Sequence, residues 1–112
     1  MKLTTKNDIN VFKLEGSILQ DESEKLDLYF SELIESQENR IIVDMTDANH
    51  ICSMVLGQMV FYKKKLNSNH GDIKLVIIDE DLLELFDITL LNRVFEIFSN
   101  VDEAVKAFQN DN

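Results

Sequence analysis

The sequence predicts an α/β fold: a mixed, mostly parallel sheet with an N-terminal strand pair and four helices, in the order ββαβαβαβα. The first observation is that short apolar runs alternate with segments whose apolar residues recur at helical spacing. The second is that the first two strand-like segments are separated only by a short polar turn. Strands joined through helices pair in parallel with right-handed crossovers, so the helices are expected to lie against the sheet.

The strand pair and the first helix occupy the N-terminal third of the chain. Within residues 8–19, Ile9, Val11 and Phe12 alternate with polar residues before Gly16, and residues 2–5 can pair with this strand across a polar turn. Asp21 followed by Glu24 resembles a capping box, and apolar residues then recur at helical spacing. The first helix is therefore expected over 21–36.

The middle of the chain predicts a central strand followed by a second helix. Residues 40–45 form a continuous apolar run, as expected of a strand that is covered on both faces. A polar loop is expected over 46–52, and the helical pattern begins at Ser53 and continues to Leu66. The basic triplet Lys63–Lys65 lies in the last turns of this helix, where cations suit the helix dipole.

The last third of the chain continues the alternation of strand and helix. Residues 72–78 read as another buried strand, and the acids at 79–81 favour the first turn of a third helix. A short strand is expected within 94–98. Ser99 and Asp102 then predict the cap of a last helix.

Composition limits the classes of partner. The chain has 112 residues, with 11 Lys and Arg against 21 Asp and Glu, which gives a formal net charge of -10. This charge repels phosphate backbones and anionic membrane surfaces, so neither nucleic acid nor direct membrane binding is expected. Cys52 is the only cysteine, and no apolar run approaches the roughly 18 residues of a spanning helix. We expect one cytoplasmic domain over residues 1–112.

Candidate catalytic and metal-binding groups have simpler structural explanations. The acids at 79–81 are stabilised by the helix dipole without any ion. His50 and Cys52 could both contact zinc, but such a site needs three or four ligands, and His70 is the only other histidine. No acid–base pair, activated nucleophile or cofactor motif is recognisable. We therefore expect no enzymatic activity, no cofactor and no metal.

Asp44, at the end of the predicted central strand, lies where open α/β sheets place their ligands. A phospho-accepting receiver domain uses an aspartate at such a position, together with an acidic pair after its first strand and a lysine after its last. Here Asp8 stands alone in a turn, and residues 99–100 are Ser and Asn. The receiver interpretation is therefore disfavoured.

Several stretches together resemble a known family. The order of LEGSI, a long helix, RIIVDMTDANHICSMVLGQMVFYKKKL, IKLVIID and FDITLLNRVFEIFSNVDEAVKAF is similar to the STAS domain of bacterial anti-sigma-factor antagonists, over nearly the whole chain. In that family an Asp-Ser-Ser-Gly-Leu-Gly or Asp-Ser-Thr-Gly-Leu-Gly turn opens a helix, and residues 52–57, Cys-Ser-Met-Val-Leu-Gly, occupy this turn. The matching residues are Ser53, Leu56 and Gly57. The residues that differ are Cys52, Met54 and Val55.

The resemblance implies a phosphorylation switch at Ser53. It implies that the unphosphorylated domain binds an anti-sigma factor with a kinase fold, which releases a sigma factor, and that a phosphatase acting on Ser53 restores binding. It also implies that the helices pack mainly against one face of the sheet. From the residues themselves, Ser53 is expected at a helix N-terminus, as the N-cap, where free N–H groups and the dipole favour an anion.

The partner surface is expected in the loop and the first turns of the second helix, where polar side chains run directly into apolar ones. Its expected members are Asp47, Asn49, His50, Cys52, Ser53, Met54 and Gln58. An alternative is a non-phosphorylated STAS scaffold, or a subunit of a larger signalling or transport complex. The departures from the family motif leave this alternative open.

Overall fold

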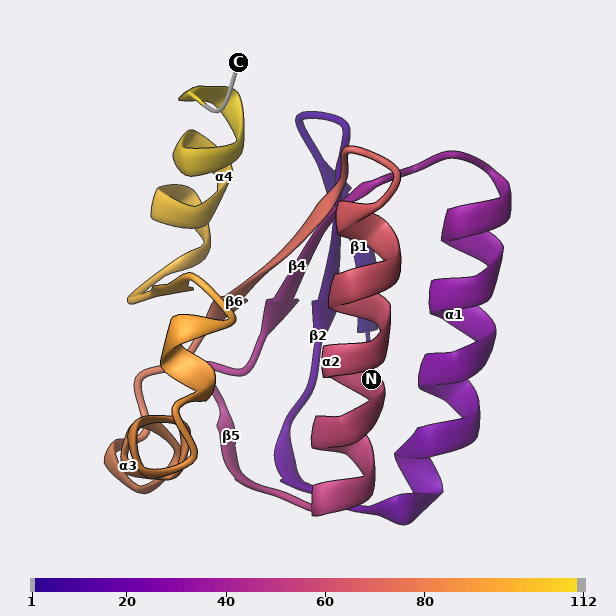
Figure 1. Cartoon of the computed structure of the whole chain (residues 1–112). Helices are drawn as coiled ribbons and strands as arrows, with labels where there is room; N and C mark the ends of the chain where they lie inside the picture. Colours follow the sequence, from indigo (N-terminus) through magenta and orange to yellow (C-terminus); the bar gives the residue numbers. More distant parts are fainter. Residues whose placement is uncertain (1, 111–112) are drawn as a thin grey trace.

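The structure, a computed structural model, describes residues 2–110. Its main sheet has the spatial order β1-β2-β4-β6-β7 (Figure 1). β1 (Lys2–Lys6) and β2 (Ile9–Lys13) are antiparallel, whereas β4 (Arg40–Asp44), β6 (Asp72–Val76) and β7 (Ile97–Phe98) run parallel to β2. The predicted mixed, mostly parallel sheet is therefore confirmed.

The turn between β1 and β2 explains why the pair forms. Asn7 and Asp8 both have positive φ, 53° and 65°. A two-residue turn with positive φ at both positions matches the right-handed twist of the strands that it joins, and Asn and Asp tolerate this conformation better than most residues. The predicted turn is thus confirmed, and β1 is an edge strand.

A second, two-stranded sheet pairs β3 (Gly16–Ile18) with β5 (Ala48–Ile51) in parallel. The prediction of a loop throughout 46–52 is therefore wrong. The chain segments that leave β2 and β4 remain side by side beyond the main sheet, because the Leu14 N–H donates to the carbonyl of Asp44 at 3.0 Å. The observed order is βββαββαβαβα, with β3 and β5 added to the predicted elements.

Four α-helices follow in the predicted places. They are α1 (Ser23–Glu35), α2 (Ser53–Asn67), α3 (Glu80–Ile88) and α4 (Val101–Asn110). The 3-10 turns η1 (Gln20–Glu22) and η2 (Leu91–Arg93) precede α1 and follow α3. None of the helices within residues 2–110 is long and apolar enough to cross a membrane.

Two helix starts differ from the prediction. α1 begins directly after η1 without a side-chain cap, so the predicted capping box of Asp21 and Glu24 does not form. At the start of α4 the side chain of Asn100 accepts a hydrogen bond from the Glu103 N–H at 2.9 Å, and the predicted cap at Ser99 is wrong by one residue. Ser and Asn are both preferred N-cap residues, so their order in the sequence does not decide which of two neighbours caps the helix.

The helices cover the two faces of the sheet unequally. α1, α2 and α3 pack on one face, where Val43 of β4 shares a buried cluster with Phe30 and Phe86. α4 packs on the other face, where Ile42 contacts a smaller cluster that includes Phe108. Neighbouring residues of a strand point to opposite faces, so both faces of β4 are buried. The prediction that helices lie mainly on one face is confirmed.

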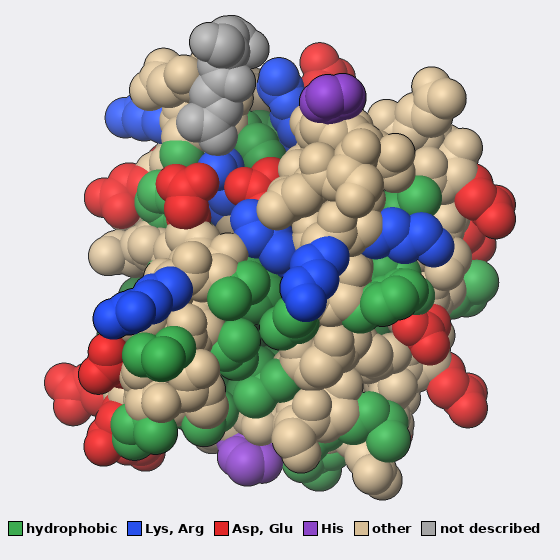
Figure 2. All heavy atoms as spheres, in the orientation of Figure 1, with side chains coloured by type: hydrophobic (Ala, Val, Ile, Leu, Met, Phe, Trp, Pro, Cys, Tyr) green, Lys and Arg blue, Asp and Glu red, His purple; other side chains and the backbone are tan. Residues whose placement is uncertain are grey.

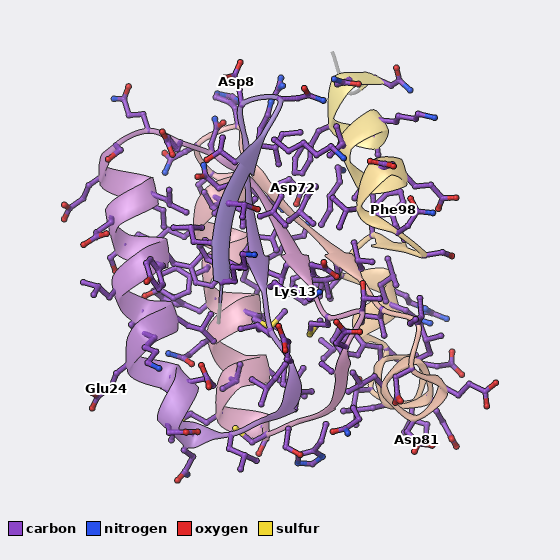
Figure 3. The ribbon with its side chains drawn as sticks, turned by 180° about the vertical axis from the view of Figure 1, so that it is seen from behind. Asp8, Lys13, Glu24, Asp72, Asp81 and Phe98 are labelled. Carbon is purple, nitrogen blue, oxygen red and sulfur yellow. The ribbon has the colours of Figure 1, made fainter. Side chains whose placement is uncertain are left out.

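Buried charges are paired around β6. Lys74 is fully buried within this apolar strand, where its Nζ lies 2.7 Å from a carboxylate oxygen of Glu96 and 4.7 Å from the centre of the Phe108 ring. Asp72, labelled in Figure 3, pairs with Lys74 and also with Lys63 of α2. Lys63, expected from the sequence to interact with the helix dipole, is buried, and Asp72 reaches its ammonium group.

Candidate partner-binding site around Ser53

Ser53 is exposed and is the first residue of α2. The N-cap is Cys52, which has extended backbone (φ −79°, ψ 158°) and makes no side-chain capping hydrogen bond. The prediction that Ser53 is itself the N-cap is therefore wrong by one position. Because the Leu56 N–H donates to the Cys52 carbonyl at 3.1 Å, the N–H groups of residues 53–55 precede the first helical hydrogen bond.

The N-terminus of α2 lacks the carboxylates that occupy the other helix starts. No acidic residue lies in its first turn. At α3, by contrast, the Asp79 carboxylate accepts a hydrogen bond from the Leu82 N–H. No side chain of its own first turn therefore neutralises the positive end of the α2 dipole, and a negative group carried by Ser53 would be stabilised there.

The small sheet positions the segment before Ser53. The Cys52 N–H donates to the Ile18 carbonyl at 2.9 Å, which fixes the point where α2 begins. Within β5, Ala48 and Ile51 are buried whereas Asn49 and His50 are exposed. The pairing of β5 with β3 therefore presents the two polar side chains to solvent.

Asp44 is used to bend the chain after β4. Its carboxylate accepts hydrogen bonds from both the N–H and the hydroxyl of Thr46, with the N–H bond at 3.0 Å, and the residue is buried. The side chain is thus committed to the local turn. Asp47, the next acid, is exposed and pairs with Lys13 at 2.9 Å. The hydrogen bond and the charge of Asp47 raise the pKa of Lys13 above its usual 10.5.

Gln58 does not join the exposed residues around Ser53. Its side chain lies on the side of α2 that faces α1, and its Nε2 donates to the Ser23 carbonyl at 3.0 Å. Its Oε1 is buried without a hydrogen-bond partner among the described residues. Gln58 therefore links the starts of two helices. The helical period alone could not distinguish this inward-facing side from an exposed one.

Two apolar residues lie near the start of α2. Met54 was singled out from the sequence and is 50% exposed, while Leu19, which the sequence analysis did not single out, is 46% exposed. Leu19 follows Ile18, whose carbonyl accepts a hydrogen bond from the Cys52 N–H, so it lies near the start of α2. On the outer side of α2 lie Gly57, with open space around it, and the exposed Phe61. The candidate surface is thus a polar strand edge beside an apolar helix start.

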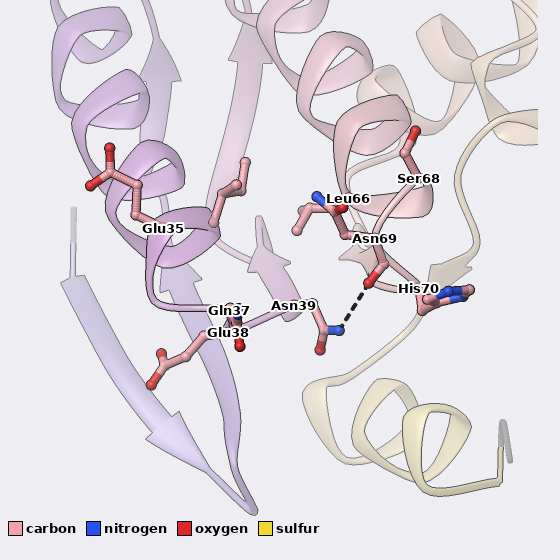
Figure 4. Close-up of a pocket in the computed structure, with 9 residues that line it drawn as sticks. Glu35, Gln37, Glu38, Asn39, Leu66, Ser68, Asn69 and His70 are labelled. Carbon is pink, nitrogen blue, oxygen red and sulfur yellow. Dashed lines mark hydrogen bonds between the residues drawn. The ribbon is translucent and has the colours of Figure 1, made fainter.

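One hollow in the molecule lies away from Ser53. A cavity of about 550 Å³ is bounded by the ends of α1 and α2, at the opposite end of α2 from Ser53 (Figure 4). There the Asn39 side chain donates to the Asn69 carbonyl at 3.3 Å, next to His70. His70 is therefore remote from His50 and Cys52. Within residues 2–110, no group of three His, Cys, Asp or Glu side chains is placed to hold a metal ion.

The comparison with known families decides the identity of the fold. The family model described as "STAS domain" matches residues 1–104. The chain belongs to the STAS domain family. Proteins of related sequence include a candidate anti-sigma factor antagonist of Thermotoga neapolitana, 30% identical over 80 residues, which are 71% of each chain. A Thermotoga maritima protein of the same description is 29% identical over 77 residues, 69% of this chain and 68% of the relative.

Solved STAS-like structures agree with the whole architecture. The crystal structure of a candidate anti-sigma factor antagonist from Thermotoga maritima has a TM-score of 0.89 at 21% identity, covering 97% of this chain and 94% of the other. The crystal structure of an anti-sigma factor antagonist from Mycobacterium paratuberculosis has a TM-score of 0.85 at 16% identity, with coverage of 97% and 92%. At this identity the likeness establishes the fold.

Proposed function

We propose that this STAS domain is an anti-sigma-factor antagonist that binds an anti-sigma factor through the surface around Ser53. The observation that carries the proposal is an exposed serine at an uncapped helix start, followed by the half-exposed Met54 and with the half-exposed Leu19 near the same helix start. Apolar side chains next to exposed polar ones suit a protein–protein contact. The family membership and the names of the relatives support the same role. The domain acts by binding and not by catalysis.

Phosphorylation of Ser53 switches this binding off. The partner is an anti-sigma factor with a kinase fold, which modifies the serine, and a phosphatase reverses the modification. A phosphate adds a charge of about −1.5 to −2 and is stabilised by the free N–H groups at the start of α2. The same charge would have to be desolvated when Leu19 and Met54 are buried against the partner. The modified form is therefore released.

The departures from the family motif have different structural roles. Val55 is fully buried in the main core, and Cys52 packs against that core. Met54 instead points outward and is half exposed. The substitutions at 52 and 55 thus serve packing, whereas Met54 alters the surface that a partner meets. We infer that Met54 adapts the domain to its own anti-sigma factor.

The test uses the partner obtained by pull-down from the native cell and titrated calorimetrically. Ser53→Ala should bind as tightly as the wild type, whereas Ser53→Asp or the phosphorylated form should bind at least tenfold more weakly, about 1.4 kcal/mol. Ser99→Asp is the matched control, because it adds the same charge at an exposed serine beside the start of α4. Equal binding by Ser53→Asp and the wild type would disprove the switch.

The second candidate function is a non-phosphorylated scaffold within a larger signalling or transport complex. It is favoured by Met54, which replaces the second hydroxyl of the family motif at an exposed position. Incubation with the kinase partner and mass spectrometry of Ser53 separates the two functions. A partner that binds tightly while Ser53 stays unmodified would favour the scaffold.

A further inference from the structure

A second surface, formed by α3 and η2, exposes large apolar side chains. Ile88 is 70% exposed and Leu90 is 53% exposed, and Leu83 and Val94 are also open to solvent. We define the α3 shoulder by Leu83, Glu84, Asp87, Ile88, Leu90 and Val94. It includes neither Ser53 nor any residue of the surface proposed above.

The α3 shoulder is a fixed platform. Phe86 and Phe95 are both buried, and their rings pack edge to face with centroids 6.3 Å apart. In the turn between them, Leu91 packs against the main core, and its carbonyl accepts hydrogen bonds from Val94 and Phe95 at 3.0 Å each. Since these inward-facing residues already fill the core beneath the turn, Leu90 and Val94 remain outside.

Leu90 has a backbone conformation that disfavours a branched apolar residue. Its φ of 62° and ψ of 16° lie in the left-handed region, directly after Thr89 at the end of α3. This is the position at which helices most often have glycine, and a residue with a side chain is strained there. More than half of Leu90 is exposed, so core packing offsets little of this cost. Strained backbone conformations of this kind cluster at binding sites, so the exposed Leu90 side chain is a candidate for contact with another molecule.

The charges of the α3 shoulder are acidic. Glu84 lies one turn before Ile88, and Asp87 lies one turn after Leu83, so carboxylates and apolar side chains alternate on the outer side of the helix. Figure 2 shows acidic and hydrophobic side chains interleaved over α3, and Figure 3 shows Asp81 directed outward from the same helix. Between Lys74 and Lys106 the only basic residue in the sequence is Arg93, which is exposed at the end of η2, so the carboxylates of this region outnumber its cations.

The exposed apolar side chains and the carboxylates of the α3 shoulder together favour one kind of partner. An anionic membrane or a nucleic acid would be repelled by the carboxylates, and a second copy of a chain with net charge -10 would bring like charges together. An amphipathic helix with lysine or arginine beside its apolar side fits both features. We infer that the α3 shoulder, which shares no residue with the surface around Ser53, is a docking surface for a basic amphipathic helix of a partner protein.

A defined probe tests this inference on the full chain. The probe is a synthetic 18-residue peptide with leucine on one side and lysine on the flanks, titrated into isotope-labelled protein and followed by amide NMR signals. The signals of residues 83–94 should shift most, and binding should weaken as salt is added. A matched peptide with glutamate in place of lysine should bind at least tenfold more weakly.

Variants separate docking from folding. Leu90→Gly removes the exposed side chain and relieves the backbone strain, so it should be at least as stable as the wild type and bind the lysine peptide at least threefold more weakly. Adding Ile88→Asn should bring the loss to tenfold. The matched control is Leu28→Asn on α1, because Leu28 is 58% exposed and lies one turn from Glu24 and from Glu32. This control should not alter peptide affinity.

Three results would overturn the inference. The first is equal loss of affinity in Leu28→Asn and Leu90→Gly, or peptide-induced shifts spread over all acidic surfaces, because binding would then be non-specific. The second is equal binding of the glutamate peptide. The third is self-association or membrane binding through the same residues. If the wild type forms a dimer in sedimentation, or binds anionic phosphatidylserine vesicles, and Leu90→Gly abolishes this, the occupant is a second copy or a membrane.

Discussion

Val55 offers a quantitative test of how this chain differs from the STAS motif. The family has glycine at this place, whereas Val55 is fully buried among the residues that pack α2 on the sheet. Val55→Gly removes a side chain whose burial contributes about 2 kcal/mol, and leaves a cavity. Glycine also lowers helix propensity by about 0.5 kcal/mol relative to valine. The free energy of unfolding should therefore fall by about 3 kcal/mol.

The assay is urea unfolding followed by circular dichroism. With a slope typical of a small domain, a loss of this size lowers the unfolding midpoint by about 2 M urea. Met54→Thr is the companion variant, because it restores a hydroxyl of the motif at a half-exposed position and should change stability by less than about 0.5 kcal/mol. A loss below about 1 kcal/mol in Val55→Gly would refute the assignment of Val55 to core packing.

Two further predictions concern a helix cap and a buried phenol. Asn100→Ala should lower the free energy of unfolding by about 1 kcal/mol, because Asn100 caps α4. Ser99→Ala, the control, should lower it by less than half as much. Equal losses of the two variants in urea unfolding would contradict the assigned cap. Burial, and secondarily Asp27, raise the pKa of Tyr62 above its usual 10.0. The folded state therefore favours the protonated phenol, so its contribution to stability is complete below pH 10 and is lost as pH rises through the folded pKa. In unfolding curves measured between pH 9 and pH 11, Tyr62→Phe should lose less stability with rising pH than the wild type. An equal pH dependence in the two proteins would contradict the assignment of this loss to Tyr62.

The turn chemistry and the periodicity of the sequence were sufficient for the main sheet and the helices. Asn7 and Asp8 suit a two-residue turn, the run at 40–45 reads as a strand buried on both faces, and the helical patterns end close to the observed helix ends. These signals are local, since they depend on backbone preferences and on the spacing of apolar residues over a few turns. β3 and β5 carry no such signal. They form because the chain segments after β2 and β4 leave the sheet side by side.

For the candidate site, too, some features could be predicted from the sequence and others could not. The sequence alone determined that Ser53 opens a helix and that polar residues precede it, because the change of periodicity at this serine is local. Only the tertiary structure decided that Gln58 faces α1, that Leu19 lies near the start of α2 and that Val55 is core whereas Met54 is surface. It also decided that Leu90 and Ile88 form an exposed acidic-rimmed platform. Which side of a helix is covered depends on the elements that pack against it, and these are brought together from distant parts of the chain.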